Sequence, residues 1–501
     1  MAMATPEKRL EWKVGLQNPV DKFLTAETYG HKVNVSGASL KVKQTWVLEL
    51  NKDETVYIRS HLGLYLTADK FGNVSCSSES HGEDEKFMVE YASDGTGRWS
   101  FKHPKFGKYL GGTDEDIQCL AKVASDEDMS LWYVPMAMHP QITLFNVNRK
   151  RYVKLDNNEL RCIQLTPWGP EALITLEFKC GKYAFKTADS RYLTHTGHLT
   201  DEHGKNTKFS LELKLSADSD LAGLAFKDCE GKYLTAYGGS GVLKTRNKIV
   251  SRDELFSLME SHPQVIFIAS NGKQASIRQG LEVTASQAET GEKEIFQIEY
   301  IKKTKKWSVY TTEGKYWRLD NNGSIIADVT SADENCQFDL TWQKDGTAVI
   351  KWSNGKYLLH RGTGALIANS DTISEKEMFV IRVVNRPVLV LKGENGYLSM
   401  ISSGSCTTRY ACNKSTYDVL QLERGPGGAY FVKGENSKYW TLGPDNSVQA
   451  DSATPIPFIF EFNGDSEITI RAPNDMYLKG EKSGGFAANS PEPRKDCVLR
   501  F

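Results

Sequence analysis

Residues 226–234 read FKDCEGKYL and end on the motif that decides the fold: a basic, an aromatic and an aliphatic residue at 232–234. The same small-or-basic, aromatic, aliphatic (or tryptophan) arrangement recurs along the whole chain. Its aromatic residues are Phe23, Tyr65, Tyr109, Tyr152, Tyr192, Tyr233, Tyr316, Tyr357, Tyr397, Tyr439 and Tyr477. Successive aromatic residues are 38 to 44 residues apart, except for one double gap in which GKQASIRQ around Gln274 takes the expected place. The sequence therefore contains twelve units.

Each unit repeats one order of elements. The aromatic motif is followed by a Gly/Asn turn, a second strand ending in a small residue, and an alternating apolar strand such as WVLEL, KFMVEY, ITLEF, IFQIEY or CQFDLTW. Alternation with a period of two, bounded by turn residues, is typical of half-buried antiparallel strands. The sequence predicts an all-β protein.

A second, longer period separates two architectures, a propeller with one blade per unit and trefoils with three units each. The strings HPQITLF, HPQVIFIA and NRPVLVLK place Pro140, Pro263 and Pro387 at 123 and 124 residues apart, so the long period spans three units. A twelve-blade propeller would not mark every third blade. The spacing predicts four tandem β-trefoil domains.

The predicted boundaries are 1–138, 139–260, 261–385 and 386–501. Because almost no linker separates them, we expect the four domains to pack into a compact rigid body. The repeated tyrosines are predicted to bury their rings in the barrel cores.

Composition limits the functional classes. The N-terminal residues lack the apolar core of a signal peptide, and no run reaches the roughly 18 apolar residues of a membrane span, so we expect a cytoplasmic protein without membrane insertion. Nine scattered cysteines without a C-x-x-C pair indicate reduced thiols. A net charge of -1 argues against a nucleic-acid partner.

Motifs for catalysis are missing from the sequence. It contains no hydrolase elbow, Walker loop, Rossmann fingerprint, HExxH or EF-hand loop. The best metal candidate, THTGHLTDEH, matches no standard ligand spacing and is interpreted as a solvated turn. Its possible ligands are His195, His198, Asp201, Glu202 and His203. We expect no enzyme activity, no metal and no cofactor.

A sugar-binding trefoil is the second functional class. Ricin-type lectins repeat Q-x-W in each unit, whereas Gln44-Thr45-Trp46 is the only match here. A single tryptophan that closes a strand is more often part of the core. An enzyme is the third class, and no convergent constellation supports it.

Clusters of basic residues are the remaining signal. They comprise Lys41 and Lys43 with Lys22 nearby, residues 149–151, and the lysines within 302–306. Each alone is typical of a solvated face. Together they suit an acidic partner, because complementary charge speeds encounter and fixes orientation.

At this point the sequence resembles the fascin family. The matching stretches are KFLTAETYGHKVN, GASLKVKQTW, RSHLGLYLTADKFGNVSC, HPQITLF, NRKRYVKL, PWGPEALITLEF, FKDCEGKYL, RDELFSL, SNGKYL, NRPVLVL and KYWTLG, and they spread over all four predicted domains. The resemblance implies a monomer that bundles parallel F-actin in protrusions such as filopodia. It implies no catalysis.

The resemblance also implies two actin-binding surfaces. The first uses lysines of the first domain together with residues of the last, at Lys22, Lys41, Lys43, Glu394 and Lys479. The basic pair expected at 401–402 is absent, because SMISSG occupies 399–404. The second surface carries Lys244, and Arg361 stands in place of a lysine.

A regulatory serine is implied as well. Ser39 directly precedes the LKVK segment and matches the serine of a family phosphorylation switch, although the residues alone also fit an ordinary turn. A phosphate adds about -1.5 to -2 charges to a lysine patch, so loss of actin binding is expected. Ser276 is a second candidate of the same kind.

Overall fold

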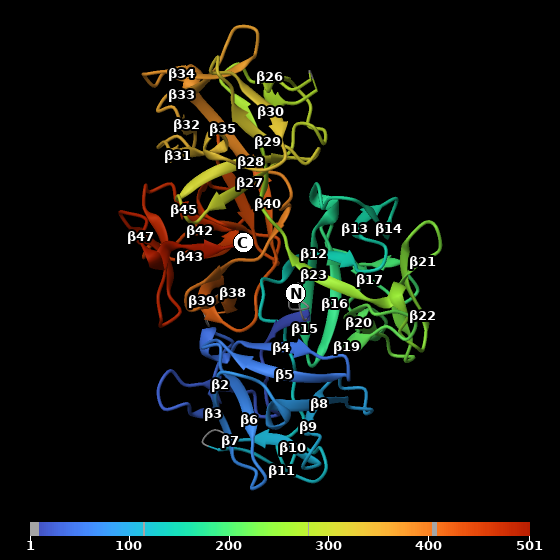
Figure 1. Ribbon diagram of the computed structural model, residues 1–501. Coiled ribbons are helices and arrows are strands. Elements are labelled where there is room, and N and C mark those ends of the chain that lie inside the picture. Colours follow the sequence, from blue (N-terminus) through green and yellow to red (C-terminus); the bar gives the residue numbers. More distant parts are fainter. Residues whose placement is uncertain (1–9, 114–115, 279, 403–407) are drawn as a thin grey trace. The chain divides into compact units, whose positions relative to one another are not determined.

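The computed structural model describes residues 10–113, 116–278, 280–402 and 408–501. It consists of short antiparallel strands (Figure 1). Eight single-turn 3-10 helices, η1 to η8, lie among the described residues. The chain forms two compact units, the first comprising 1–165 and 174–260 and the second comprising 166–173 and 261–501. No helix in the described ranges is long and apolar enough to cross a bilayer.

The elements of the first trefoil are β1 (Leu10–Val14), β2 (Phe23–Ala26), β3 (Val33–Gly37), η1 (Val42–Gln44), β4 (Trp46–Leu50), β5 (Thr55–Ser60), β6 (Tyr65–Ala68), β7 (Val74–Ser78), η2 (Glu83–Glu85), β8 (Lys86–Tyr91), β9 (Trp99–His103), β10 (Lys108–Gly112) and β11 (Ile117–Ala121).

The elements of the second trefoil are β12 (Gln141–Asn146), β13 (Arg151–Asp156), β14 (Glu159–Gln164), η3 (Pro170–Ala172), β15 (Ile174–Lys179), β16 (Lys182–Thr187), β17 (Tyr192–Leu193), β18 (Leu199–Thr200), η4 (Lys205–Thr207), β19 (Ser210–Leu215), β20 (Ala222–Lys227), β21 (Tyr233–Tyr237), β22 (Val242–Asn247), η5 (Arg252–Glu254) and β23 (Phe256–Glu260).

The elements of the third trefoil are β24 (Gln264–Ala269), β25 (Gln274–Ser276), β26 (Thr284–Gln287), β27 (Phe296–Ile301), β28 (Lys306–Thr311), β29 (Tyr316–Leu319), β30 (Ile325–Val329), η6 (Glu334–Cys336), β31 (Phe338–Trp342), β32 (Ala348–Trp352), β33 (Tyr357–His360), β34 (Leu366–Ser370), η7 (Glu375–Glu377) and β35 (Met378–Val383).

The elements of the fourth trefoil are β36 (Val388–Leu389), β37 (Lys392–Gly393), β38 (Gly396–Ser402), β39 (Thr408–Lys414), β40 (Leu420–Arg424), β41 (Tyr430–Lys433), β42 (Tyr439–Leu442), β43 (Val448–Ser452), β44 (Ile459–Gly464), β45 (Glu467–Arg471), β46 (Tyr477–Gly480), β47 (Phe486–Ser490), η8 (Lys495–Cys497) and β48 (Leu499–Arg500).

Each trefoil is a six-stranded barrel capped by three hairpins, as the twelve repeats predict. The third trefoil shows the closure most simply, because its barrel pairs in the order β24, β27, β28, β31, β32, β35 and back to β24. Its cap consists of the hairpins β25–β26, β29–β30 and β33–β34. In the first trefoil the bridges between Trp99 and Trp132 and between Val14 and Met136 complete the barrel. The prediction of four β-trefoils is confirmed.

The repeated aromatic motif packs differently from the prediction. The residue after each aromatic fills the barrel, as Leu66, Leu110 and Trp317 do, whereas the tyrosines lie outside these core clusters. Neighbouring residues of a strand point to opposite faces, so only one of the two can enter the core. In the unit with the double gap, Ala275 takes the core position beside Gln274.

The tyrosine hydroxyl has its own repeated partner, a glutamate on a preceding barrel strand. In seven repeats it donates a hydrogen bond to this carboxylate, in the pairs Tyr65–Glu49, Tyr109–Glu90, Tyr192–Glu177, Tyr233–Glu212, Tyr316–Glu299, Tyr439–Glu423 and Tyr477–Glu461. A lysine ammonium lies over several of these rings, for example Lys227 at 5.4 Å from the Tyr233 ring centre. Burial and the Glu461 carboxylate raise the pKa of Tyr477 to about 12, so the phenol stays protonated and keeps donating.

Within each unit, two trefoils share one hydrophobic core. Glycines at the junction allow the backbones of the two trefoils to approach closely. In the first unit a Cβ on Gly97 would lie 2.4 Å from the Gly181 carbonyl oxygen, and in the second a Cβ on Gly428 would lie 2.1 Å from that of Gly346. A buried tyrosine stands beside each contact: the Tyr183 hydroxyl accepts from the Met136 N–H, and the Tyr430 hydroxyl accepts from the Val383 N–H. The two units are thus built on the same plan.

One short segment departs from the predicted domain 139–260. Residues 166–173 belong to the second unit, where Trp168 packs with Ile266 and Ile295. The Gln264 side chain fixes the segment, because its Oε1 accepts from the Gly169 N–H and its Nε2 donates to the Pro167 carbonyl, each at 2.8 Å.

Candidate functional site

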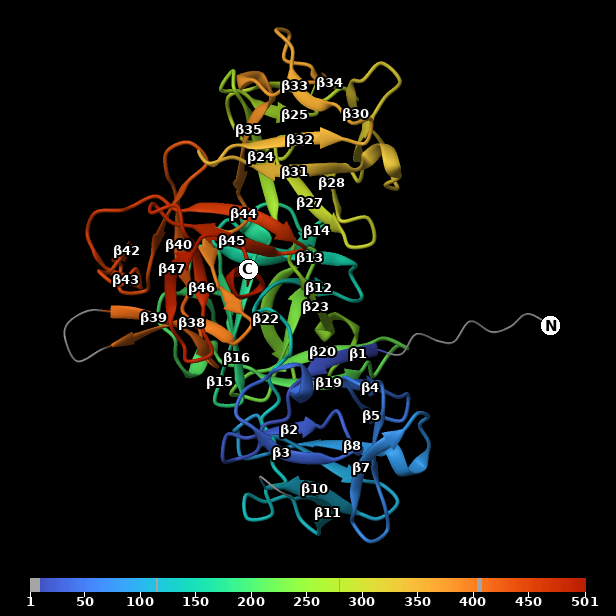
Figure 2. The ribbon, with the colours of Figure 1, turned by 90° about the vertical axis from the view of Figure 1, so that its left-hand side faces the viewer.

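The predicted lysines of the first trefoil gather around η1. This helix packs on β2, where the Gln44 amide donates to the Thr25 hydroxyl at 3.1 Å, and Lys22 directly precedes that strand. Lys41 directly precedes η1 and Lys43 is its middle residue, and both side chains are exposed. The structure therefore brings the three lysines to the region where η1 packs on β2. The hairpin of β2 and β3 that carries this region is labelled in Figure 2.

An ion pair joins η1 to the hairpin β2–β3. The Lys43 Nζ lies 2.8 Å from the Glu27 Oε2, and the side chains remain 46% and 32% exposed. The Lys43 ammonium and then the Asn34 amide lower the pKa of Glu27. Glu27 was not predicted, because it precedes Lys43 by sixteen residues and becomes its neighbour only when the hairpin folds.

The two candidate regulatory serines differ in accessibility. Ser39 is partly exposed and lies two residues before Lys41. Ser276 is fully buried, and its hydroxyl donates to the Glu294 carboxylate at 2.7 Å. A kinase would therefore reach the Ser276 hydroxyl only after local unfolding of the third trefoil.

Lys244 belongs to a cationic group on the hairpin β21–β22 of the second trefoil. Its Nζ lies 3.9 Å from the ring centre of Tyr237, and the Arg246 guanidinium carbon lies 4.6 Å from the same ring. Lys244 and Arg246 are two residues apart on one strand and thus share a face. Arg246 and Tyr237 were not predicted, although the K-x-R spacing on a strand is a usable signal.

Arg361 begins the exposed turn between β33 and β34 in the third trefoil. Its N–H donates to the Ala365 carbonyl, and its carbonyl accepts from the Gly364 N–H, so the turn is fixed while the side chain stays exposed. Arg361 belongs to the second unit and Lys244 to the first.

Glu394 and Lys479 meet around η8 in the fourth trefoil. Glu394 pairs with Lys495 at 2.6 Å, and Lys479 pairs with Asp496 at 3.6 Å. The Lys495 ammonium lowers the pKa of Glu394, and Lys482 acts in the same direction. Lys495 is 85% exposed and was not predicted, because its partner precedes it by about a hundred residues.

An arginine on the neighbouring strand lies opposite the position of the missing basic pair at 401–402. Ile401 pairs with Arg409 across β38 and β39, and the Arg409 guanidinium lies 2.9 Å from the Asp445 carboxylate. The adjoining residues 403–407 lie outside the described part of the chain. A cation therefore stands beside this position, although it comes from the opposite strand.

The predicted metal candidate is rearranged by folding. His195 lies near Asp228 and Glu230 instead of its sequence neighbours. Asp228 accepts from the Thr245 hydroxyl and from two backbone N–H groups of its own turn, and Glu230 pairs with Lys232 at 2.7 Å. These carboxylates have partners within the hairpin that hold its turn.

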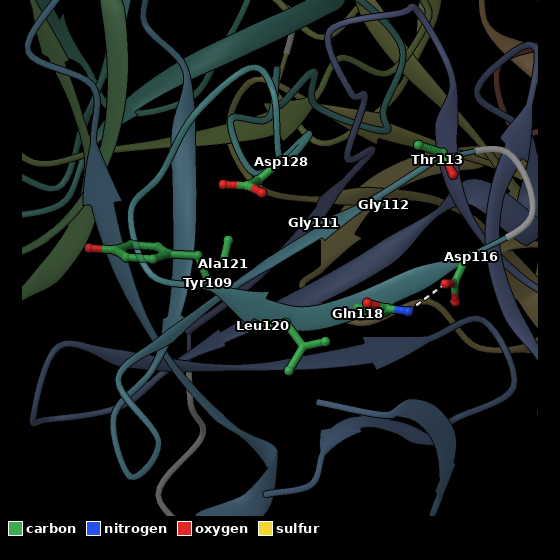
Figure 3. A pocket seen from close by; sticks show the side chains of 9 residues that line it. All are labelled: Tyr109, Gly111, Gly112, Thr113, Asp116, Gln118, Leu120, Ala121 and Asp128. Carbon is green, nitrogen blue, oxygen red and sulfur yellow. Dashed lines mark hydrogen bonds between the residues drawn. The ribbon is translucent and has the colours of Figure 1, made fainter. Parts of the chain in front are cut away.

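A small pocket on the first trefoil offers no catalytic arrangement. It measures about 170 Å³ and is lined by residues that include Tyr109, Gln118, Leu120 and Asp128 (Figure 3). In Figure 3 the dashed line marks the hydrogen bond that the Gln118 amide donates to Asp116. We assign it no chemistry.

The single Q-x-W motif is part of the core. Trp46 is fully buried, and its indole N–H donates to the Leu24 carbonyl at 2.9 Å. It offers no sugar platform, so the lectin interpretation loses its one sequence feature.

Tandem trefoils that carry exposed cationic groups define a binding scaffold. A family model described as the fascin domain matches this chain four times, at 20–134, 142–258, 270–381 and 399–499. The chain belongs to the fascin family, which comprises actin-bundling cytoskeletal proteins and not enzymes.

Full-length relatives agree with this assignment. Fascin-2 from Bos taurus is 39% identical and covers 97% of this chain and 96% of its own. Fascin-2 from Homo sapiens is 39% identical, with 98% of each chain covered. Fascin from Strongylocentrotus purpuratus is 32% identical and covers 99% of this chain and 100% of its own.

Proposed function

We propose that this protein cross-links parallel actin filaments as a monomer, in the bundles of cell protrusions. A monomer can bundle filaments only if it carries at least two binding surfaces. Family membership over the whole chain and the cationic groups of separate trefoils support the proposal.

The observation that carries the first surface is the display of lysines at η1. Lys41 and Lys43 extend from a turn that is anchored by the buried Gln44, so their backbone is rigid while their ammonium groups stay in solvent. Such preorganised cations suit an acidic filament, because little conformational entropy of the backbone is lost on binding.

The fourth trefoil contributes its own cations to the proposed binding. Lys479 and the exposed Lys495 flank η8, and Arg409 stands opposite Ile401. We infer that Lys495 and Arg409 supply the positive charge that the segment at 401–402 lacks. Glu394 orients Lys495 through their ion pair.

The second surface is proposed to use Lys244 and Arg361, each in its own unit. The Tyr237 ring holds Lys244 and Arg246 as a pair of cations, which favours contact with carboxylates. Arg361 keeps the positive charge of a lysine but adds a planar, bidentate donor group.

Ser39 is proposed as the switch of the first surface. It is partly exposed beside two lysines, so a phosphate there would pair with them and repel an acidic filament. Phosphorylation is therefore expected to release the filament without unfolding the trefoil.

Sedimentation with actin filaments tests the proposal, at high speed for binding and at low speed for bundling. We expect the wild type to bundle, and Lys43→Glu and Ser39→Glu to lose most of this activity. Lys105→Glu is the matched control, because Lys105 forms a similar exposed ion pair with Asp84 at 2.9 Å on the same trefoil. A wild type that neither binds nor bundles would overturn the function.

A further inference from the structure

Two large apolar side chains are exposed beside the lysines of η1. Tyr29, in the turn between β2 and β3, is 87% exposed, and Val42, between Lys41 and Lys43, is 69% exposed. A single exposed apolar residue is ordinary on a protein surface. Two of them next to one group of cations form a mixed surface.

Tyr29 and Val42 belong to two neighbouring segments, the β2–β3 hairpin and η1. Glu27 precedes Tyr29 by two residues on the hairpin, and Lys43 directly follows Val42 on η1. The buried Gln44 amide, which donates to the Thr25 hydroxyl on β2 at 3.1 Å, anchors η1 beside this hairpin, and the Glu27 and Lys43 charges lie 2.8 Å apart across the same junction. We name Tyr29, Lys41, Val42 and Lys43 the η1 patch.

The ion pair also weakens a purely electrostatic explanation of binding. The Glu27 carboxylate partly offsets the charge of Lys43. Surface charge is further screened over about 8 Å at physiological ionic strength. A contact that salt does not screen would therefore prolong the complex at this surface.

We propose that Tyr29 and Val42 enter an apolar recess of the actin filament whose border is acidic, and that this contact provides the salt-independent part of binding at the first surface. This inference rests on the proposed function. The lysines accelerate encounter and set orientation, while burial of the two side chains slows dissociation. The chemistry of the patch requires a partner site with both an apolar centre and carboxylates at its rim.

Sedimentation at KCl concentrations from about 50 to about 300 mM separates the two contributions, since only the ionic one is screened. We compare the wild type with Tyr29→Ser, Val42→Ser and Lys43→Gln. Each serine variant is expected to bind actin filaments about 10-fold more weakly than the wild type at every salt concentration. This is the loss of affinity that follows when one apolar side chain is no longer buried at an interface. Lys43→Gln is expected to bind more weakly mainly at low salt, so its salt dependence is flatter.

Two further variants act as controls. Val123→Ser removes a valine of the same 69% exposure from the same trefoil and is expected to bind like the wild type. Tyr29→Phe keeps the apolar ring and is expected to retain the wild-type affinity.

The outcomes distinguish the inference from the function on which it rests. If the wild type binds and both serine variants bind as tightly as Val123→Ser, the apolar contact is refuted while actin binding stands. If Tyr29→Phe is as weak as Tyr29→Ser, the hydroxyl and not the ring makes the contact, which also refutes the inference. If the wild type does not bind, the proposed function itself fails.

Discussion

Replacing Gly428 by alanine tests how tightly the third and fourth trefoils are joined. The new Cβ would lie 2.1 Å from the carbonyl oxygen of Gly346, whereas carbon and oxygen normally approach to about 3.3 Å. The two backbones must therefore separate by about 1 Å. Neither contact atom belongs to a flexible side chain, so the strain cannot be relieved by a change of rotamer.

The same separation would stretch hydrogen bonds that cross the junction. The Arg471 guanidinium donates to the Gln343 carbonyl at 2.8 Å, and the Tyr430 hydroxyl accepts from the Val383 N–H at 2.8 Å. An extension of about 1 Å takes such a bond beyond the usual limit near 3.2 Å. Overpacking costs about 1–3 kcal/mol and an unsatisfied buried group about 1–3 kcal/mol more, so we expect a loss of about 3 kcal/mol in the free energy of unfolding.

Thermal unfolding followed by circular dichroism measures this loss. For a unit of this size each kcal/mol lowers Tm by about 2–4 °C, so Gly428→Ala is expected to melt about 6–12 °C below the wild type. Gly362→Ala is the control, because a Cβ there meets no atom within 4 Å. If both variants melt at the wild-type temperature, the inferred close contact of the backbones is refuted.

Four further predictions concern buried polar groups and the cysteine thiols. Tyr233→Phe removes the hydrogen bond at 2.7 Å to the buried Glu212 carboxylate and should lower the free energy of unfolding by about 1–3 kcal/mol in urea titrations, whereas no change would contradict a structural role for the repeated pairs. Ser276→Glu puts a second carboxylate beside Glu294 and should destabilise the fold by about 3–5 kcal/mol. Burial alone would raise the pKa of Glu294, but the guanidinium and hydroxyl bonded to it outweigh burial and lower that pKa below 4.5. Its stabilisation is thus present at neutral pH and is lost as the pH falls through the lowered pKa, so acid unfolding of Glu294→Gln should depend less on pH below about 4.5. Among the described cysteines, the exposed Cys180 should react with Ellman's reagent in the native protein before the buried thiols do, and equal rates would contradict the burial.

Much of the first surface could be predicted from single residues, and its supporting partners could not. Lys41 and Lys43 were expected and are exposed at η1. Glu27 and Tyr29 were missed, because they join these lysines only through the fold of the hairpin. Ser276 was predicted from its local sequence, which carries no information about burial.

The sequence by itself determined the number and kind of the domains. The spacing of the aromatic motif and the prolines at every third unit predict four trefoils, because each unit supplies the same strands to a barrel and a cap. Only the tertiary structure decided which residue of each motif enters the core, and that Glu394 and Lys479 meet around η8. The physical reason is that strand alternation limits a side chain to one of two faces, while closure of the barrel decides which face is inside and which distant charges become neighbours.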